Sequence, residues 1–496
     1  MTQSSADPRL AAARRALQEG AYDQAIEAFE SILVAYPAEI DALRGIAEAY
    51  RYFNRGDRVA ELYELAAAHQ PDDPEISAGF VEALIANADL ARGRAQIEAA
   101  IVSHPKNLRL KLLLAQIEMI EGNRDAARQI FWSGLEADSE NTDCLYHLAD
   151  IAPDDELQKL GSALAPAWVH KDERDPWDAA SLGYAYGKTA ERQREFNKAW
   201  KGFSFGAKQK RNIVRFDEQT YARTHDAHRQ TFASSSPSPL EQDLPGRGFV
   251  FIASLPRSGS TLVERILDAH KDVEAIGERS FVYDSVTYWH KTYGPDPARL
   301  FSEEAIKDTG AHYIEKARGA ASRPGAVIVD KSITNYVFLG FLRTILPGAR
   351  FVHVARHPLD TAISCFSTLF FAGNEWTYDF GEIGRNIRRY QKIMHHWIDQ
   401  CPDDIQTVPY EELVSDPERW TRDLVSFCEL DWDPACLTFH ESDRPVLTAS
   451  LNQVRQPIYS SAKGRHAPYQ KYLDPLIVAM GKRAADPNWF RASKEN

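Results

Sequence analysis

The sequence of 496 residues has few cysteines, no long apolar run and no excess of positive charge. Its five cysteines are scattered and include no Cys-x-x-Cys pair, so neither a disulfide framework nor a cysteine-rich zinc site is expected. No window approaches the ~18 apolar residues of a membrane-spanning helix, and residues 1–7 lack the basic and apolar segments of a secretory signal. We therefore expect a cytoplasmic protein with free thiols and no membrane contact.

The net charge of −13 is concentrated in the first part of the chain. Residues 1–150 contain 14 Lys and Arg against 25 Asp and Glu, and the remainder holds 44 basic and 46 acidic residues. Because the first part is acidic and the rest is balanced, nucleic-acid binding is not expected. Hydrophobic content of 44% and charged content of 26% are ordinary for globular proteins, and the length predicts about two to four domains.

The first part of the chain is repetitive. Pro37, Pro71 and Pro105 recur at one constant interval, and Ser139 takes the next place. The same interval relates Gly20, Asn54, Ala88 and Gly122; Phe29, Tyr63, Ile97 and Phe131; and Ala47, Val81, Ala115 and Ala149. This pattern resembles the tetratricopeptide (TPR) repeat, a unit of about 34 residues in which paired helices stack into a solenoid. We expect such an α-solenoid over residues 8–150, with an arbitrary helical bundle as the alternative.

A helical segment that has lost the regular period follows over residues 151–233, where a connector or cap is expected. Its residues 179–187 resemble a decayed repeat. For its basic stretch at 198–215 we favour a solvated helix face. The alternative is a basic surface at the edge of a site for an anionic ligand. A Ser/Pro-rich run then ends the helical pattern and indicates a linker at 234–247.

In residues 248–480 the sequence pattern changes and predicts alternating strands and helices. Residues 249–253 form a short apolar run that predicts a buried strand, followed by a helix-like stretch at 261–270. Further strand candidates lie at 327–329 and 351–355. This alternation predicts an α/β domain with a mainly parallel sheet.

A phosphate-binding turn lies between the first predicted strand and its helix. The turn aims backbone N–H groups and the positive helix end at one point, where an anion binds. Ser258 is small, Gly259 permits close approach of the backbone, and Ser260 and Thr261 add hydroxyl donors. Ser260 stands where a Walker loop has its lysine, which disfavours an ordinary ATP or GTP hydrolase or kinase.

The sequence from Pro256 to Thr261 resembles the 5′-phosphosulfate loop of sulfotransferases that use 3′-phosphoadenosine 5′-phosphosulfate (PAPS). The closest likeness is to the tyrosylprotein sulfotransferase type, in the bacterial group where such a domain follows TPR repeats. The resemblance implies a P-loop-like sulfotransferase fold with PAPS as co-substrate. It implies that the loop binds the donor through Pro256, Arg257, Ser258, Gly259, Ser260 and Thr261.

Further positions extend the resemblance. It implies that Arg356 and Ser364 grip the 3′-phosphate; the family's basic residue four positions beyond that serine is Thr368 here. Glu278 corresponds to the catalytic base, and Lys331 to the lysine on the bridging oxygen of the leaving phosphate.

Three more site residues are implied near the end of the chain. Tyr410 is similar to the tyrosine beside the adenine. Ser450 resembles a serine that stabilises the transition state and contacts the donor, and Arg465 stands where the family has a phosphate-contacting lysine. Arg257, Lys331 and Ser450 together would offset charge on the transferring group and the leaving phosphate.

The sequence thus predicts a PAPS-dependent sulfotransferase with no metal requirement, acting on an acceptor hydroxyl. Four classes of acceptor are compatible with the sequence: a tyrosine of a peptide or protein, a sugar, a lipid and a small phenol. The alternative is a TPR scaffold whose sulfotransferase-like domain binds the nucleotide without catalysis. The TPR surface is expected to bind a protein or a second copy of the chain.

Overall fold

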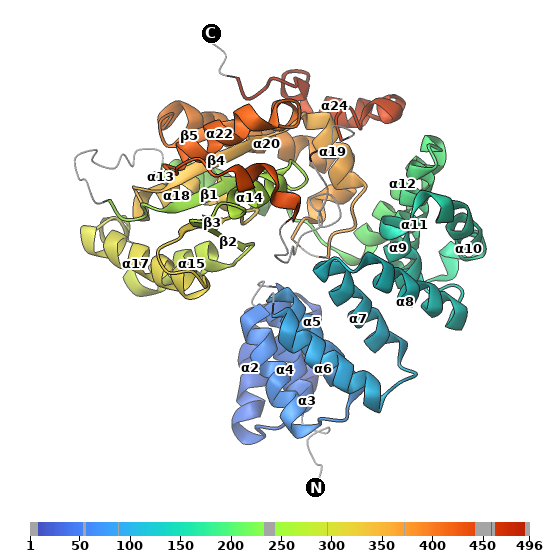
Figure 1. Ribbon diagram of the computed structural model, residues 1–496. Helices are drawn as coiled ribbons and strands as arrows, with labels where there is room; N and C mark the ends of the chain where they lie inside the picture. Colours follow the sequence, from blue (N-terminus) through green and yellow to red (C-terminus); the bar gives the residue numbers. More distant parts are fainter. Residues whose placement is uncertain are drawn as a thin grey trace. The chain divides into compact units, whose positions relative to one another are not determined.

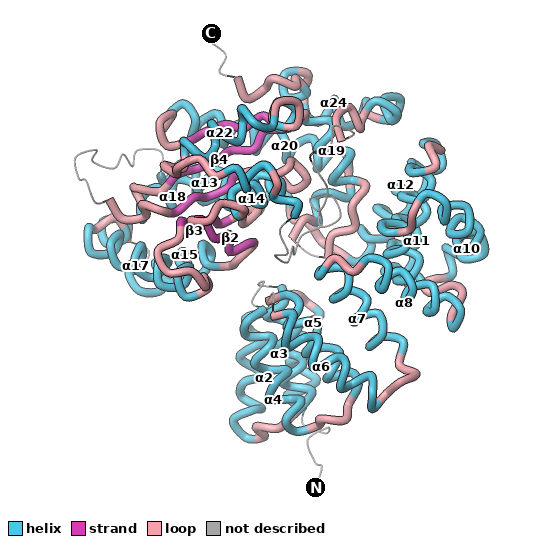
Figure 2. The backbone as a smooth tube through the Cα atoms, viewed as in Figure 1, coloured by secondary structure: helices cyan, strands magenta, loops and turns pink. Residues whose placement is uncertain are grey.

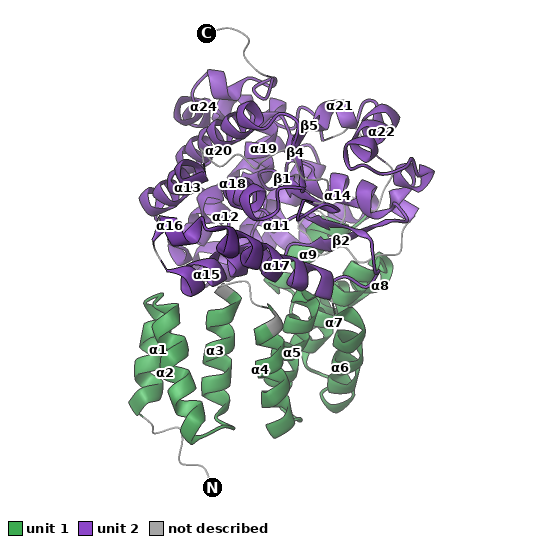
Figure 3. Cartoon of the chain, turned by 90° about the vertical axis from the view of Figure 1, so that its left-hand side faces the viewer, with its two compact units in different colours: residues 1–153, 443–447 green, residues 154–442, 448–496 purple. Residues whose placement is uncertain are grey.

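The computed structural model describes residues 8–52, 56–87, 89–232, 244–294, 296–371, 373–441, 458 and 462–491. The chain divides into two compact units, the first ending at Pro153 and the second beginning at Asp154 (Figure 3). The predicted boundaries at 150, 233 and 247 stay predictions, and residues 234–243 of the expected linker lie outside the described residues. No helix of the described part is long and apolar enough to cross a membrane.

The first unit consists of paired helices (Figures 1 and 2). They are α1 (Pro8–Gln18), α2 (Tyr22–Ala35), α3 (Ile40–Tyr52), α4 (Gly56–His69), α5 (Pro74–Ala86), α6 (Leu90–Ser103), α7 (Leu108–Glu121), α8 (Arg124–Ala137) and α9 (Thr142–Ile151). The starts of α3, α5, α7 and α9 are evenly spaced by the period of the sequence repeat, and so are those of α2, α4, α6 and α8. The predicted helical repeat is therefore confirmed.

Packing inside the repeats also follows the period. A side chain at Gly45 would lie 2.3 Å from the ring of Phe29, and one at Gly79 would lie 2.2 Å from the ring of Tyr63. The two pairs occupy equivalent positions in successive repeats. A large aromatic ring and a glycine thus let successive helices approach closely.

The helix caps show that the period continues further than the sequence reading allowed. Asp73, Asn107 and Asn141 precede α5, α7 and α9, and each side chain accepts hydrogen bonds from backbone N–H groups of the first turn. Asp175, one period after Asn141, caps α11 (Pro176–Arg192) in the same way. The regular period thus extends into this helix, which belongs to the second unit and contains the decayed repeat expected at residues 179–187.

The helical part of the second unit comprises α10 (Leu157–Val169), α11, α12 (Phe196–Ile213) and α13 (Glu218–Phe232). Helices α11 and α12 form a tight hairpin because glycines face each other across it. A side chain at Gly183 would lie 2.6 Å from the backbone nitrogen of Gly206, and one at Gly202 would lie 2.5 Å from that of Gly187.

Part of the basic stretch on α12 is buried. Lys210 is 3% exposed, donates to the carbonyl of Phe371 across 3.3 Å and lies over the ring of Trp177. Burial lowers its pKa to about 8. Arg211 pairs with Glu382. The interpretation of 198–215 as a solvated face is wrong for these two side chains.

The α/β part of the second unit has a five-stranded, all-parallel sheet in the order β2-β3-β1-β4-β5. The strands are β1 (Phe249–Ala253), β2 (Val273–Gly277), β3 (Val327–Asp330), β4 (Arg350–Ala355) and β5 (Ile405–Pro409). The helices are α14 (Ser260–Asp268), α15 (Phe281–Tyr293), α16 (Pro297–Leu300), α17 (Glu303–Gly319), α18 (Asn335–Ile345), α19 (Pro358–Phe366), α20 (Phe380–Gln400), α21 (Tyr410–Leu413), α22 (Pro417–Phe427) and α24 (Asp474–Met480). The predicted α/β fold with a parallel sheet is confirmed.

Helices cover both faces of the sheet (Figure 1). Val250 and Ile252 of β1 join the core formed with α14 and α22, whereas Phe249 and Phe251 face Tyr313 of α17. Strands β2 and β5 are the two edges of the sheet and were not predicted, because each is short and mixes apolar with polar residues. The five cysteines of the chain are buried free thiols.

Candidate active site at the carboxyl edge of the sheet

The sequence-predicted residues follow the carboxyl ends of the strands. Arg257 and Gly259 follow β1, Glu278 follows β2, Lys331 follows β3, Arg356 follows β4 and Tyr410 follows β5. Because all strands are parallel, these ends share one edge of the sheet, which is where open α/β sheets bind ligands. Ser450 lies outside the described residues.

The loop after β1 is shaped by two residues with positive φ. Arg257 has φ 64° and Gly259 has φ 100° at the start of α14. A non-glycine residue in this region is strained, which is a feature of functional sites. A side chain at Gly259 would lie 2.4 Å from the ring of Tyr410, so the close approach of this ring requires a glycine.

Arg356 braces this loop. Its Nη1 donates to the carbonyl of Arg257 across 2.7 Å and its Nη2 to the carbonyl of Ala462 across 2.6 Å. Its guanidinium also lies 4.9 Å from the centre of the Tyr410 ring. Its Nε is buried and has no hydrogen-bond partner among the described residues. Arg356 therefore joins the loop, Tyr410 and the segment beginning at residue 462.

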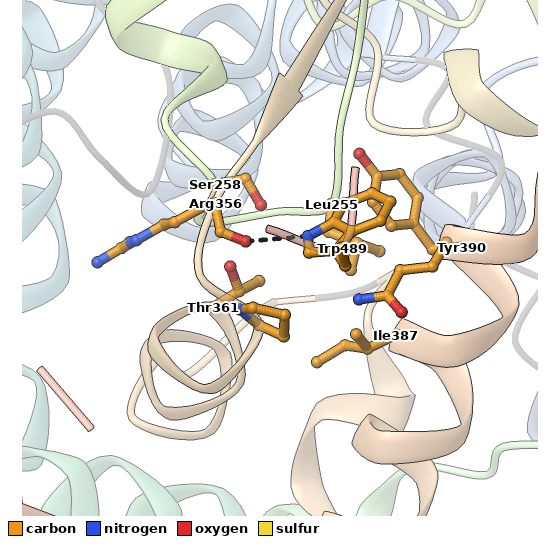
Figure 4. Close-up of a pocket in the computed structure, with 9 residues that line it drawn as sticks. Leu255, Ser258, Arg356, Thr361, Ile387, Tyr390 and Trp489 are labelled. Atoms are coloured by element: carbon orange, nitrogen blue, oxygen red, sulfur yellow. Dashed lines mark hydrogen bonds between the residues drawn. The ribbon is translucent and has the colours of Figure 1, made fainter. Parts of the chain in front are cut away.

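A small pocket lies beneath the loop (Figure 4). Its lining includes Ser258 of the loop, Thr361 of α19 and Tyr390 of α20. The guanidinium of Arg356 points away from this pocket, and the indole of Trp489 donates to the Arg356 carbonyl across 3.4 Å (Figure 4). The pocket therefore lies on the side of Arg356 that is away from its guanidinium group.

Two guanidinium groups converge on the hydroxyl of Ser364. Arg257 Nε and Arg465 Nη1 each lie 3.3 Å from its Oγ. Thr368, which replaces the family's basic residue, donates to the Ser364 carbonyl across 2.7 Å. Arg465 therefore brings to Ser364 a positive charge that Thr368 lacks.

The thiol of Cys365, next to Ser364 in the sequence, is also close to positively charged side chains. Arg257, Arg356 and Arg465 all act on it electrostatically, although burial is the larger effect and raises its pKa to about 12. Three guanidinium groups near the last turn of α19 are suited to an anionic ligand.

Lys331 lies between two carboxylates. Its Nζ is 2.5 Å from Oε1 of Glu278 and 3.7 Å from Oε2 of Glu264, a residue of α14 that the sequence reading missed. Burial opposes the charge of Lys331, but the two carboxylates outweigh it and raise its pKa above the ordinary value. Burial raises the pKa of Glu264 to about 7, against the lowering effect of Lys331.

Asp330, the last residue of β3, orients the turn that carries Lys331. Its carboxylate accepts hydrogen bonds from Ser332 N at 2.9 Å, Tyr313 Oη at 2.8 Å and Asn335 Nδ2 at 3.1 Å. Burial raises the pKa of Asp330 above its ordinary value. The backbone on both sides of Lys331 is thereby held in place.

One group of possible metal ligands occurs within the described ranges: His357, Asp360 and His466 offer ligand atoms within 4.8 Å of one another. The Asp360 carboxylate already accepts from Gly464 N at 2.8 Å and from N and Nδ1 of His466 at 2.9 and 2.6 Å. His357 Nδ1 accepts from Leu359 N. The bonds of Asp360 anchor the segment that carries Arg465 to α19.

Residues 250–434 match the sulfotransferase family, and this part of the chain is a sulfotransferase-family domain after an N-terminal helical repeat region.

Similar proteins include both bacterial and animal chains. An uncharacterized protein of Aquifex aeolicus (strain VF5) is 30% identical over 356 residues, which are 68% of this chain and 46% of that protein. Protein-tyrosine sulfotransferase 1 of Danio rerio is 26% identical over 234 residues, 45% of this chain and 63% of that protein. The chain thus spans less than two thirds of the length of either relative. Among solved structures, the sulfotransferase domain of the Synechococcus PCC 7002 olefin synthase is 18% identical with a TM-score of 0.31, covering 46% of this chain and 90% of that domain.

Proposed function

We propose that the protein is a PAPS-dependent sulfotransferase that transfers a sulfuryl group to an acceptor hydroxyl. The observation that carries the proposal is the Glu278–Lys331 pair at the same sheet edge as the loop of residues 254–259. The pair places a proton acceptor beside a buried cation, which is the combination that group transfer to a hydroxyl needs. Membership of the matched segment in the sulfotransferase family supports it.

The hydrogen-bond donors and cationic side chains of the site fit the two anionic ends of PAPS. The loop after β1 and the N-terminus of α14 would hold the 5′-phosphosulfate, with Arg257 beside it. Ser364, Arg356 and Arg465 would hold the 3′-phosphate. When bound, PAPS supplies the sulfuryl group and a phosphate leaving group.

In the proposed reaction the acceptor oxygen forms a bond to sulfur while the bond between sulfur and the leaving phosphate oxygen breaks. Glu278 takes the proton of the acceptor hydroxyl. Lys331 offsets the negative charge that develops on the leaving oxygen. Because a sulfuryl group carries less charge than a γ-phosphoryl group, Lys and Arg side chains suffice for this purpose, and we propose that no metal is required.

For the acceptor we favour a tyrosine hydroxyl of a peptide or protein. The support is similarity to proteins named protein-tyrosine sulfotransferase from several animals, at 23–26% identity over 38–46% of this chain. The paired helices of residues 8–151 remain the expected binding surface for a protein or a second copy of the chain.

Calorimetry with nucleotides tests the donor assignment. We expect 3′-phosphoadenosine 5′-phosphate (PAP) to bind at least ~100-fold more tightly than AMP, because each charged hydrogen bond is worth about 1.5–3 kcal/mol. The Arg356→Ala variant should lose most of this preference. Equal affinities of the wild type for PAP and AMP would contradict the 3′-phosphate assignment.

Turnover separates an enzyme from a nucleotide-binding scaffold. Radiolabelled PAPS is incubated with the purified protein and a cell extract, and the labelled product is identified by mass spectrometry. We expect transfer of the label to a tyrosine-containing product. Tight PAP binding without any transfer would favour the scaffold.

A further inference from the structure

Glu191, near the end of α11, contacts the candidate donor site from outside the segment that matches the sulfotransferase family. Its Oε2 accepts from Nη2 of Arg465 across 2.6 Å, and its Oε1 accepts from Arg465 Nε across 3.3 Å. The hydroxyl of Tyr469 donates to the same Oε1 across 2.8 Å. One carboxylate therefore holds one edge of a guanidinium group, from Nε to Nη2, that is 274 residues away in the sequence.

The part of Arg465 that Glu191 does not hold faces the anion site. Its Nη1 lies 3.3 Å from Ser364 Oγ, the hydroxyl that Arg257 also approaches. Two positive groups so close to one hydroxyl repel each other, and the repulsion is strong where water is excluded. A fixed negative charge behind Arg465 offsets this repulsion and leaves Nη1 directed at Ser364.

No other carboxylate among the described residues bonds Arg465 in this way. Asp360 lies close enough to act on its charge, but its oxygens accept from Gly464 and His466. Burial opposes the charge of Arg465, whereas Glu191 favours it both electrostatically and by hydrogen bonding, and the pKa of Arg465 is raised above its ordinary value. Glu191 is thus the principal counter-charge of this arginine.

The hairpin of α11 and α12 is held firmly against the segment that carries Arg465. Trp200 of α12 stacks on Tyr472 with ring centres 4.3 Å apart and also contacts Phe366 of α19. Phe196 meets Tyr469 edge-on at 5.7 Å. The glycine contacts between α11 and α12 leave the hairpin little freedom. The position of Glu191 is therefore set by packing on both sides.

We propose that Glu191 is a positioning residue for the 3′-phosphate subsite of the donor and acts through Arg465. The proposal rests on the proposed function, because it assumes that Arg465 contacts the phosphate. It makes the helical hairpin before the family-matched segment a component of the donor site. Removal of Glu191 should weaken binding of ligands with a 3′-phosphate and spare ligands without one.

The test is a double-mutant cycle on the full-length protein, with affinities for PAP and AMP measured by calorimetry. Arg465→Ala should weaken PAP binding by about 10- to 100-fold. Glu191→Gln should weaken it by about 5- to 20-fold and change AMP binding by less than about twofold. In the Arg465→Ala background, Glu191→Gln should have no further effect on PAP beyond about twofold.

The matched control is Glu195→Gln on the same hairpin. Glu195 pairs with Lys198 at 2.8 Å on the exposed surface, so this variant removes an ion pair of the hairpin without touching Arg465. PAP affinity should equal that of the wild type. Tyr469→Phe is the milder variant for the case that Glu191→Gln fails to fold; it removes one hydrogen bond to Glu191 and should weaken PAP binding selectively by about two- to fivefold.

The outcomes distinguish a failure of the proposed function from a failure of the role proposed for Glu191. If the wild type does not prefer PAP over AMP, the proposed function fails. If the wild type prefers PAP but Glu191→Gln binds PAP as tightly or more tightly, Glu191 does not position Arg465 and this inference fails alone. Equal losses for PAP and AMP, or full additivity with Arg465→Ala, would also overturn it. With PAPS as substrate, Glu191→Gln should raise KM more than it lowers kcat.

Discussion

Lys331 and Glu278 follow the neighbouring strands β3 and β2, and their charged atoms meet at 2.5 Å. Lys331 contacts only one oxygen of Glu278, and in the proposed mechanism the other oxygen, Oε2, accepts the proton. Glu264 lies 3.7 Å from the Lys331 Nζ, so a second carboxyl group stands beside this buried amine. In the proposed mechanism Lys331 would turn from Glu278 to the leaving group while Glu264 stays beside it.

Substitution of the proposed base tests this mechanism. Glu278→Gln preserves size and hydrogen bonding but cannot take up the proton, so turnover should fall by about 10²- to 10⁴-fold. PAP affinity should change by less than about threefold, because the proton acceptor serves the acceptor hydroxyl. Steady-state rates and calorimetry on the same preparations measure both quantities. Lys331→Ala is the contrasting variant and should lower both turnover and donor affinity. Full turnover of Glu278→Gln with the identified acceptor would show that the base lies elsewhere.

The buried carboxyl group of Glu264 predicts a pH dependence of stability. Its pKa is raised from 4.5 to about 7 in the folded protein, so between these values the folded state holds a proton that the unfolded state has released. This contribution to the free energy of unfolding is complete below about pH 4.5 and is lost as the pH rises to about 7. The groups that act on Glu264 are Lys331, Glu278, Asp268 and Arg265.

Glu264→Gln cannot titrate and isolates this effect. The free energy of unfolding of the wild type, relative to that of Glu264→Gln, should fall by up to ~1.4 kcal/mol per pH unit between about pH 4.5 and 7, and then level off. Denaturant titrations of both proteins across this range measure the difference. A difference that stays constant with pH would contradict a raised pKa at Glu264.

The glycine of the phosphate loop gives a third prediction. In Gly259→Ala the positive φ strains the backbone, and the new methyl group collides with the ring of Tyr410. We expect a loss of stability of more than about 1 kcal/mol, together with a clear loss of PAP affinity. Gly122→Ala is the matched control, since Gly122 has φ 96° and ψ 2° against 100° and 9° at Gly259. It should carry the same strain in the repeat unit and leave PAP affinity unchanged; equal PAP affinities of both variants would contradict the role of the loop.

The regular parts of the fold were readable from the sequence because they depend on local patterns. The spacing of the sequence repeat predicted the helix pairs, and the apolar run at 249–253 coincides with β1. Capping residues at Asp73, Asn107, Asn141 and Asp175 also carry the period into the second unit, where residues 179–187 alone predict only a decayed repeat. The edge strands β2 and β5 were missed because their half-buried residues do not form an apolar run.

The residues of the site also fall into two groups, those that sequence motifs predict and those that depend on tertiary contacts. Residues next to strand ends, such as Lys331 and Arg356, could be placed by motif, and the structure brings them to one edge of the sheet. Glu191 and Glu264 could not, because their importance comes from tertiary contacts with Arg465 and Lys331. No local pattern marks a glutamate on a helix as the partner of an arginine 274 residues away. The predicted role of Ser450 stays a prediction.

The burial of the five native thiols makes the chain suitable for site-directed spectroscopy. Burial raises the pKa of Cys401 to about 11 and those of the other four to about 12, so the reactive thiolate is scarce at neutral pH. A cysteine introduced on an exposed helix of each unit would therefore react first with a fluorescent or spin label, without removal of the native ones. Distances between two such probes, with and without nucleotide, would report in solution whether the first and the second unit move together.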